Sequence, residues 1–432
     1  MRSAMTRRAA LAAAAVLAAG ALACGGTETT SEPAPDEAAA AADTPVSPER
    51  PFGQDAQFLA SHADTVELTS SDGAARIVVV PGWQGRVMTS TAEGPGGNGF
   101  GWINYDLVAS GEVQPHINAV GGEDRFWLGP EGGQFAIFFA PGDPFDLEHW
   151  QTPAVIDTDA YEVASRDASA LSMHRAASLT NYSGTSFELT IDRTVRLLDR
   201  ATAGELLGVD VPDVVRAVAF ESENTITNVG QSPWTRDAGL LSIWILGMFK
   251  HSPATTIVVP FRAGPVTELG PVVNDAYFGK VPADRLRVNG NVIYFKGDGQ
   301  YRSKIGLSPL RAAAVAGSYD GRLGALTVVQ YTQPEGATDY VNSMWEIQDE
   351  PYGGDVVNSY NDGPPEPGAS PLGPFYELET SSPAAALAPG AAITHRHRTF
   401  HLAGDHDALD PIARRIFGVG IDQIEAVFST GR

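Results

Sequence analysis

The stretch FELTIDRTVRL, residues 187–197, has the pattern that decides the fold class. Its apolar residues fall at odd positions from Phe187 to Leu197, with polar residues between them. This period of two is typical of a strand with one buried and one exposed face. Short apolar runs bounded by Gly, Pro, Asn and Asp recur at residues 75–80, 135–139, 256–259, 291–295 and 324–331. The sequence therefore predicts a chain of many short strands.

The composition favours the same class. The chain has 432 residues, 43% of them hydrophobic, which is enough for a substantial core. Its 46 Gly and 30 Pro against 6 Met indicate many turns rather than a helix bundle. The 52 acidic and 29 basic residues give a formal net charge of -23. This charge argues against a nucleic-acid partner held by phosphate contacts and against anionic polymers.

A helical pattern is found only near the C-terminus. Asp410 and Pro411 have the sequence of an N-cap and a first-turn proline, and Gly418 is a weak point further on. We expect one helix, or two short ones, within about residues 405–428. Its buried face would be formed by Ile412, Ile416, Ile424 and Val427. Residues 51–432 are predicted to form one antiparallel β-sandwich domain that includes this helix.

The first 50 residues have the composition of a signal peptide followed by a flexible linker. Residues 1–23 contain three arginines and then an Ala-, Leu- and Val-rich run, as in a secretory signal peptide. The run ends at Leu22-Ala23-Cys24, which resembles the cleavage site of bacterial lipoproteins, so we expect Cys24 to be lipidated. An ordinary signal peptide followed by a stray thiol is the alternative. Residues 24–50 have almost no large apolar side chains and are predicted to be a disordered tether. The protein is thus expected to be exported and membrane-anchored, facing the periplasm or the cell exterior.

The first of three polar segments is GGEDRFWLGPEGG, residues 121–133, with His116 shortly before it. Carboxylates and arginine bind vicinal sugar hydroxyls directionally, and an indole face covers the apolar side of a pyranose. The simpler interpretation is a turn with a solvated ion pair, followed by core aromatic residues. The carbohydrate-binding candidates in this region are His116, Glu123, Arg125, Trp127 and Glu131.

Two later segments add further candidates. Residues 353–365, GGDVVNSYNDGPP, include Asn358, whose amide could bind a ligand or stabilise a turn. Their oxygen-rich composition is compatible with calcium, but the spacing is not that of an EF-hand. In the third segment Glu377 and Glu379 share one strand face, where proximity raises the pKa of at least one carboxyl if they are buried. A solvent-facing edge strand is the alternative.

Three histidines, at positions 395, 397 and 401, fall on one face of a predicted strand. Acidic or cysteine ligands at a telling spacing are missing from the sequence around them, so a zinc site receives little support. We predict neither a metal nor a cofactor. The motifs GxSxG, HExxH and the Walker loop are also absent from the sequence.

The third segment resembles the closing strands of the galactose mutarotase (aldose 1-epimerase) family. The matching pieces are Leu378-Glu379-Thr380, Leu387-Ala388-Pro389-Gly390 and residues 394–400. This resemblance implies a large antiparallel β-supersandwich and assigns the general base to Glu379. With its lipoprotein start and its GGEDRFWLGPEGG and NSYNDGP segments, the chain resembles more closely a bacterial family of unknown function within that superfamily.

The sequence also departs from the mutarotase pattern. Mutarotases have a His-Gly-Gly segment, which here is Val120-Gly121-Gly122. They also have a central Asn-His-x-Tyr-Phe-Asn segment, whose histidine protonates the ring oxygen. The comparable residues 228–249 contain no histidine. Because ring opening needs an acid as well as a base, His116 and Arg125 are the candidates for the missing acid.

Three functions follow as hypotheses. The first is an exported, lipid-anchored carbohydrate-binding protein, without classical mutarotase activity. The second is an aldose 1-epimerase-like enzyme with Glu379 as the base. The third is a non-catalytic envelope protein, in which Glu379 would pair with Arg396 or Arg398. The net negative charge favours neutral or cationic sugars over polyuronates. The first hypothesis requires a cleft lined by His116, Glu123, Arg125, Trp127, Glu131, Asn358, Glu377 and Glu379.

Overall fold

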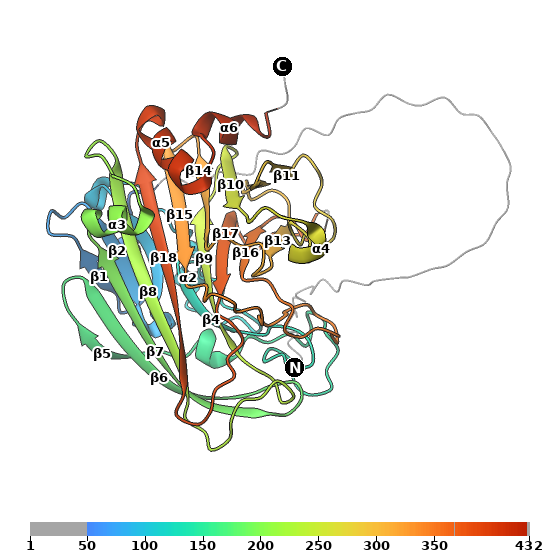
Figure 1. Cartoon of the computed structure of the whole chain (residues 1–432). Coiled ribbons are helices and arrows are strands. Elements are labelled where there is room, and N and C mark those ends of the chain that lie inside the picture. The colour runs from blue at the N-terminus through green and yellow to red at the C-terminus, as the bar shows by residue number, and fades with distance from the viewer. Residues whose placement is uncertain (1–49, 367, 430–432) are drawn as a thin grey trace, which may run out of the picture. The chain divides into compact units, whose positions relative to one another are not determined.

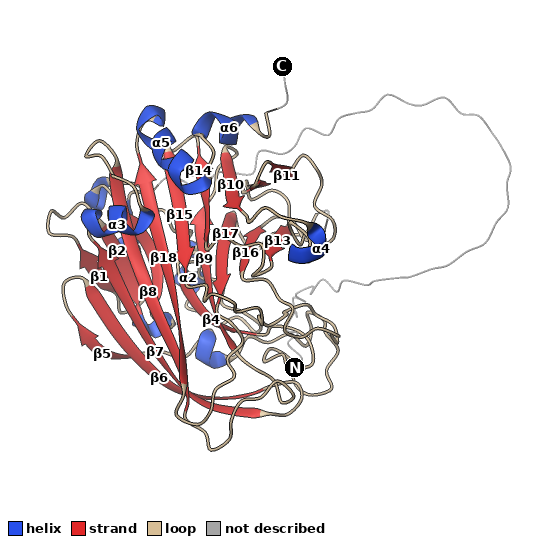
Figure 2. Ribbon diagram, in the orientation of Figure 1, coloured by secondary structure: helices blue, strands red, loops and turns tan. Residues whose placement is uncertain are grey.

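Antiparallel strands build three sheets in the computed structural model, which describes residues 50–366 and 368–429 (Figure 1). The predicted signal peptide and all but the last residue of the predicted tether lie outside these residues. The predicted all-β, antiparallel architecture is confirmed. Figure 2 shows that strands dominate the described part of the chain and that the helices are short.

The largest sheet has ten strands, in the order β11-β12-β10-β14-β15-β18-β8-β7-β6-β5, within the described ranges. In β7 (Ser186–Leu198) the predicted alternation is confirmed, since Phe187, Leu189 and Ile191 are buried while Glu188 is exposed. The other strands are β5 (Glu162–Arg166), β6 (Ala170–Thr180), β8 (Arg216–Asn228), β10 (Thr255–Pro260), β11 (Leu286–Asn289), β12 (Val292–Lys296), β14 (Val315–Asp320), β15 (Ala325–Tyr331) and β18 (Ala392–Ala403).

A second sheet, of five strands, packs against the first. Its order is β13 (Ser303–Leu307), β16 (Val357–Asn361), β17 (Phe375–Ser381), β9 (Ser242–Lys250) and β4 (Arg125–Gly129). Leu378 of β17 and Val357 of β16 share one hydrophobic cluster with Ile257 of β10 and Val329 of β15. One face of the five-stranded sheet is therefore buried against the ten-stranded sheet. The opposite face is turned away from the ten-stranded sheet and packs against loops.

Polar groups cross the space between these two sheets. Arg193 of β7 and Asp124 are both fully buried, and Arg193 Nη2 lies 2.6 Å from Asp124 Oδ1. On β18, His395 Nε2 and His397 Nδ1 each lie 2.9 Å from Thr380 Oγ1 of β17. Burial lowers the pKa of His395 to about 3 and that of His397 to about 4. Both imidazoles are therefore neutral in the folded protein at ordinary pH.

A small sheet and a helix form the N-terminal part. Strands β1 (Val66–Thr69), β2 (Arg76–Val80) and β3 (Arg86–Thr91) pair in that order. The helix α1 (Phe52–Ala60) buries Phe52 and Leu59 in a cluster with Val78 and Met88. The sequence pattern did not predict this nine-residue helix. A helix of this length depends on tertiary packing more than on its own propensity.

The predicted C-terminal helix is confirmed as two short helices, α5 (His406–Phe417) and α6 (Ile421–Ala426). Gly418, with φ of 76°, ends the first in the left-handed region. The two helices fall within the predicted range of about 405–428, but the predicted N-cap and first-turn proline were wrong, because α5 begins at His406 and Pro411 lies inside it. Asp405 is the N-cap of α5, and Asp410 lies inside the helix. The Oδ1 of Asp410 accepts a hydrogen bond from the N–H of Ile421, at the start of α6.

Both helices pack on the outer face of the ten-stranded sheet, near β10 (Figure 2). Leu409, Ile412 and Phe417 of α5 join Val258 of β10 and Leu326 of β15 in one cluster. Three further short α-helices are α2 (Tyr105–Ser110), α3 (Arg200–Leu207) and α4 (Val266–Leu269).

Four of the five predicted apolar runs lie in strands, at β2, β10, β12 and β15. The fifth prediction, residues 135–139, was wrong: these residues form a loop. Its side chains are buried all the same, and the ring of Phe138 lies 5.2 Å from that of Trp127 and 5.9 Å from that of Trp150. The run is apolar because its side chains pack against buried aromatic residues. It forms no strand.

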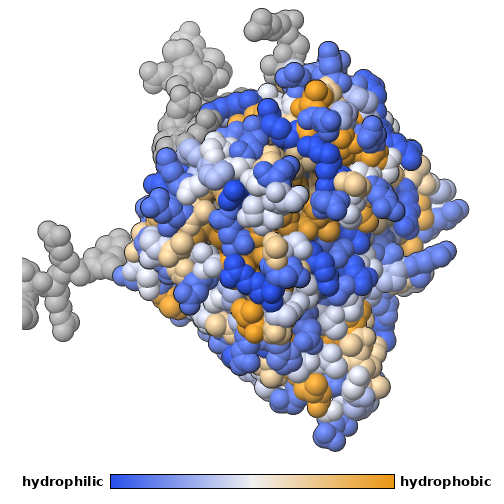
Figure 3. All heavy atoms as spheres, turned by 90° about the vertical axis from the view of Figure 1, so that its left-hand side faces the viewer, coloured by the Kyte–Doolittle hydropathy of each residue, from blue (hydrophilic) through white to orange (hydrophobic). Residues whose placement is uncertain are grey.

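Figure 3 shows one side of the molecule, on which hydrophilic side chains predominate and hydrophobic ones are scattered. None of the helices in the part of the chain that the structure describes is long and apolar enough to cross a membrane.

Candidate functional site

Six of the eight predicted site residues lie together on or beside one face of the five-stranded sheet. We call this the site face: the face turned away from the ten-stranded sheet. In the strand register Asn358 is opposite Glu379, Glu379 is opposite Leu246, and Leu246 is opposite Arg125. Directly opposite residues point to the same side of a sheet. The side chains on this face are Lys304, Asn358, Tyr360, Glu377, Glu379, Trp244, Leu246, Met248, Arg125 and Trp127.

An ion pair occupies the centre of the site face. Glu379 is fully buried, and its Oε2 lies 2.8 Å from Nζ of Lys304. The indole N–H of Trp244 donates to the same oxygen over 3.0 Å. Oε1 has no hydrogen-bond partner among the described residues. Burial alone would lower the pKa of Lys304, but the negative charges of Glu379 and then Glu131 outweigh it and raise the pKa.

A second ion pair lies beside the first. Nη2 of Arg125 lies 3.2 Å from Oε1 of Glu377, and both side chains are buried. The guanidinium carbon of Arg125 lies 4.2 Å from the ring centre of Trp127, a cation–π contact. Nε and Nη1 of Arg125 and Nε1 of Trp127 find no acceptor within the described ranges. Burial raises the pKa of Glu377, against the opposing charge of Arg125.

Glu131 follows β4 and approaches the same centre from a loop. Its backbone N–H donates to Oγ of Ser343 over 3.2 Å, and the residue as a whole is half-buried. Burial raises the pKa of Glu131 to about 7, the positive charge of Lys304 opposes this rise, and the negative charge of Glu379 adds to it. Near neutral pH this carboxyl can therefore either give or take a proton.

A hydrogen-bonded chain extends the site toward β13. Asn358 Nδ2 donates to Oη of Tyr277 over 3.0 Å, and the Tyr277 hydroxyl donates to Oδ2 of Asp355 over 2.6 Å. Burial raises the pKa of both Tyr277 and Asp355. The ring centre of Tyr277 lies 5.4 Å from Nζ of Lys304. This chain fixes the position of Asn358 and encloses Lys304.

Two loops, residues 130–150 and 340–353, cover the Trp127 end of the site face, and we call them the cover. Gln134 Nε2 donates to the backbone oxygen of Gln348, and the N–H of Gln348 donates back to Oε1 of Gln134. At Gly132 a Cβ would lie 2.4 Å from the backbone oxygen of Met344, so only glycine allows the loops to approach this closely. The rings of Trp150 and Trp345 stack 6.0 Å apart across the two loops.

The structure places the other two candidates elsewhere. Glu123 is fully buried between the sheets, where it accepts hydrogen bonds from the N–H and hydroxyl of Ser90 and lies 2.9 Å from Nε2 of His401. The prediction that Glu123 lines the cleft was therefore wrong. His116 is exposed, and its Nδ1 lies 2.7 Å from the backbone oxygen of Trp150. It belongs to the rim of the cover and makes no contact with Glu379.

Sequence reasoning missed Lys304, Trp244 and Tyr277. Lys304 alone carried a usable signal, as a single cation within the short apolar strand SKIGL at residues 303–307. Trp244 lies in a run that is apolar on both faces and gives no hint of a hydrogen bond. On the site face β9 presents Trp244, Leu246 and Met248, so the acid histidine of mutarotases has no counterpart there.

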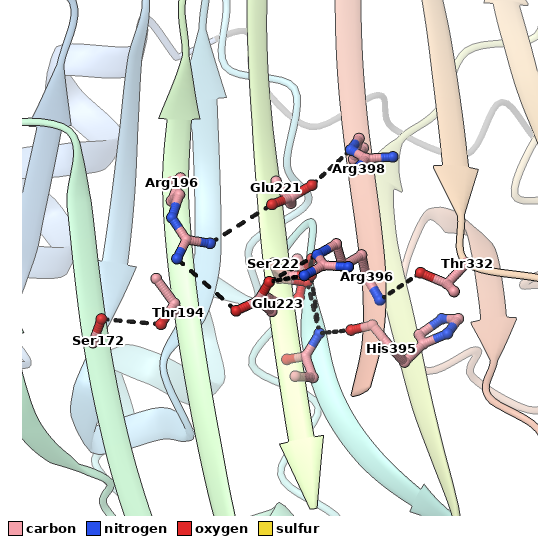
Figure 4. Close-up of polar contacts among 12 residues, drawn as sticks. Ser172, Thr194, Arg196, Glu221, Ser222, Glu223, Thr332, His395, Arg396 and Arg398 are labelled. Carbon is pink, nitrogen blue, oxygen red and sulfur yellow. Dashed lines mark hydrogen bonds and ion pairs between the residues drawn. The ribbon is translucent and has the colours of Figure 1, made fainter. Parts of the chain in front are cut away.

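The outer face of the ten-stranded sheet holds the arginines that the envelope hypothesis pairs with Glu379. Arg396 pairs with Glu223, and Arg398 pairs with Glu221 (Figure 4). Glu379 therefore does not have the predicted arginine partner. Nor do the histidines of β18 create a metal site, since no cluster of three His, Cys, Asp or Glu suited to a metal occurs in residues 50–366 and 368–429.

A pocket of about 420 Å³ opens on this same outer face, away from Glu379. It lies between the helices α3 and α5 and the strands β14, β15 and β18, and it contains no carboxylate. Without a carboxylate it offers no acid–base pair. It is lined by Leu207, Ala313, Ala314, Val315, Gln330, Tyr331, Arg398, Arg415 and Ile416.

Comparison with known proteins places this geometry in context. Residues 50–428 match the model of a family described as a family of unknown function, DUF6786. The sequence matches no curated protein. Among solved structures, a protein from Synechocystis sp. PCC 6803 is 12% identical with a TM-score of 0.48, covering 79% of this chain and 96% of that chain.

Two further solved structures are similar to this chain at a comparable level. A galactose mutarotase-like protein from Lactobacillus casei is 12% identical with a TM-score of 0.45, covering 78% of this chain and 100% of that one. A galactose mutarotase related enzyme from Lactobacillus acidophilus is 9% identical with a TM-score of 0.44, covering 79% and 99%. Similarity at this level says nothing of activity, which has to be argued from the site.

Proposed function

We propose, for a chain that belongs to the family of unknown function DUF6786, that the protein binds a carbohydrate on the site face of its five-stranded sheet. One observation carries this proposal: buried polar atoms of Arg125, Trp127 and Glu379 lie on one face without partners among the described residues. Leaving a buried donor or acceptor unpaired costs about 1–3 kcal/mol. Such atoms therefore indicate a ligand or ordered water that completes them.

The surroundings of these atoms suit a sugar. The guanidinium of Arg125 and the carboxylates of Glu377 and Glu379 offer directional bonds to hydroxyl groups. The indoles of Trp127 and Trp244, whose ring centres lie 5.5 Å apart, offer apolar surface beside them. This combination of charged hydrogen-bonding groups and aromatic rings is what recognition of a pyranose requires.

Sugar binding is expected to be lost or weakened when Arg125 is changed. Isothermal titration with a broad panel of neutral and acidic monosaccharides should show binding to the wild type. Arg125→Gln should bind at least about tenfold more weakly, because a charge-assisted hydrogen bond contributes about 1.5–3 kcal/mol. Trp127→Phe keeps an aromatic ring but removes the indole N–H together with part of the ring surface, and should cause a smaller loss.

The matched controls are Arg396→Gln, on the outer face, and Trp234→Phe, which packs against Phe187 away from the site face. Both should bind as the wild type does. If the wild type binds none of the sugars in the panel, the proposal is wrong. It is also wrong if Arg125→Gln binds with unchanged affinity.

A second candidate function is that of an aldose 1-epimerase-like enzyme. It is favoured by two carboxyl groups in different environments, those of Glu379 and Glu131. Glu379 has a free oxygen that could take the proton of an anomeric hydroxyl, and Glu131, with a pKa of about 7, could protonate the ring oxygen. Exchange between anomers, followed by NMR in the same samples, separates an enzyme from a binding protein. The enzyme hypothesis requires faster exchange with the wild type and loss of that effect in Glu379→Gln.

We further propose that the protein is exported and anchored to a membrane by lipid on Cys24, facing the periplasm or the cell exterior. The support is the sequence of residues 1–24, with its arginines, its apolar run and the single cysteine of the chain. In a detergent-phase partition of cell extracts the wild type should enter the detergent phase. Cys24→Ser should stay in the aqueous phase, and a wild type found there as well would remove the anchor from the proposal.

A further inference from the structure

The pocket on the outer face of the ten-stranded sheet lies where apolar surface meets charged surface. Its apolar wall is formed by Leu207 of α3, Val315 of β14 and Ile416 of α5. These residues belong to or adjoin the hydrophobic cluster that the C-terminal helices form with the sheet. The volume of about 420 Å³ falls within the range of roughly 300–1,000 Å³ that is typical of small-molecule sites.

The strand register explains how the charged side of the pocket meets this wall. One row of residues, directly opposite one another, crosses the strands β7, β8, β18, β15 and β14. Residues in such a row point to the same side of the sheet. The row consists of Arg196, Glu221, Arg398, Gln330 and Val315. A ligand in the pocket therefore meets polar groups at one end and apolar side chains at the other.

Both arginines of the pocket are held through Nε. Arg398 Nε donates to Oε2 of Glu221 over 2.7 Å, and Arg415 Nε donates to the backbone oxygen of Gly208 over 3.3 Å. The Nη nitrogens of the two arginines donate no hydrogen bond to any residue that the structure describes. Each guanidinium therefore keeps two nitrogen atoms for a ligand, in the planar arrangement that suits the oxygens of a carboxylate or phosphate.

The charges around the pocket favour an anion. Its lining includes two arginines and no carboxylate, in a chain whose acidic residues outnumber the basic ones by 52 to 29. Glu221 pairs with Arg398 but also lies 3.6 Å from Nη1 of Arg196, so one carboxylate faces two guanidinium groups (Figure 4). Arg415 adds a third positive charge, which has no carboxylate partner among the described residues.

Two features act against an anion and are weaker at this place. The C-terminal end of α3 carries partial negative charge on its last carbonyl groups. Two of these carbonyls are occupied, because the oxygen of Leu206 accepts from Nε2 of Gln330 over 3.1 Å and that of Gly208 accepts from Arg415. The net charge of -23 acts over long distances and is screened beyond about 8–10 Å at ordinary salt concentrations. The guanidinium groups line the pocket itself.

We propose that this pocket binds a small organic anion, a carboxylate or phosphate on a short apolar body. The anionic group lies at Arg398 and Arg415, and the body lies on the apolar wall. The site is separate from the site face and does not depend on carbohydrate binding. Ala314, which also lines the pocket, has a φ of 57°, and such strained backbone in a residue other than glycine clusters at functional sites.

Isothermal titration with hexanoate, hexyl phosphate, hexanol and acetate tests the proposal. The wild type should bind hexanoate, hexyl phosphate or both, and the comparison of the two identifies the preferred anionic group. Hexanol lacks the charge and acetate lacks the apolar body, so each should bind at least about tenfold more weakly. Arg398→Gln and Arg415→Gln should each weaken binding of the anion by about tenfold or more, because each removes a charge-assisted hydrogen bond.

Each test variant has a matched neighbour as its control. Arg396 lies two residues from Arg398 on β18, and Arg414 lies beside Arg415 on α5. Neither control residue lines the pocket, and each pairs with its own carboxylate. Arg396→Gln and Arg414→Gln should therefore bind the anion as the wild type does. An equal loss of affinity in these controls would show a general effect of surface charge and would contradict the proposal.

The remaining outcomes are equally clear. Absence of binding by both hexanoate and hexyl phosphate would overturn the proposal, as would hexanol or acetate that binds as tightly as these two. Unchanged affinity in Arg398→Gln and Arg415→Gln would overturn it as well. If circular dichroism shows that Arg398→Gln has not folded, Arg415→Gln decides, since Arg415 is exposed on its helix.

Discussion

Lys304→Met is expected to lower the free energy of unfolding by about 3–5 kcal/mol, the cost of leaving one member of a buried ion pair uncompensated. Glu379 has no exposed surface and Lys304 is only 13% exposed, so water cannot replace the ammonium group. The indole N–H of Trp244 would remain as a partner of Glu379, but it carries no charge. Urea denaturation at pH 7 measures the change.

Two variants serve as controls for this prediction. Lys280 is 83% exposed and pairs with Asp275, so Lys280→Met should change stability by no more than about 1 kcal/mol. The double variant Lys304→Met/Glu379→Gln removes both charges and should recover part of the loss. A single variant as stable as the wild type, or a double variant less stable than Lys304→Met, would contradict the prediction.

The stability of the protein is expected to fall with pH between about 6.5 and 4 because of His395 and His397. An unfolded chain protonates its imidazoles near pH 6.5, whereas burial lowers the folded pKa of these two to about 3 and about 4. In that window the unfolded state binds more protons. Each imidazole then lowers the free energy of unfolding by about 1.4 kcal/mol per pH unit as the pH falls.

The measurement is the difference between the wild type and His395→Gln/His397→Gln in urea denaturation at pH 6.5, 5.5 and 4.5. A difference is needed because Glu131 and Glu377, whose folded pKa values are raised, contribute the opposite slope. The double variant should lose much of the dependence on pH. The exposed His62 is the control, since His62→Gln should leave the slope unchanged. Equal slopes in wild type and double variant would refute the expectation.

The strand pattern predicted the class of fold because period-two alternation is a local property. It placed Glu377 and Glu379 on one face, which the structure confirms. It could not show that β13 lies two strands away from β17 in the sheet, because the order of strands depends on packing across the whole chain. Lys304 therefore became visible as the partner of Glu379 only in the structure.

For Glu123 the period-two strand pattern predicts the wrong side of the sheet. It stands two residues before Arg125, a spacing that predicts a shared face within one strand. However, β4 begins only at Arg125, and the preceding Gly121 and Gly122 have φ values of 101° and 109°. Backbone in this region is outside the range that an L-residue in a strand adopts. The chain turns there, and the Glu123 carboxyl enters the space between the sheets beside His401.

The burial of Glu379 has a consequence for ligand access. Because Glu379 has no exposed surface, a molecule from solution can touch it only after surrounding residues have moved. The reciprocal bonds between Gln134 and Gln348 join the two loops of the cover, so separating these loops would break them. The observed affinity is the intrinsic affinity of the opened form multiplied by the fraction of molecules in that form. A loosening substitution far from the ion pairs, such as one at Gln348, can thus strengthen recognition without touching the ligand.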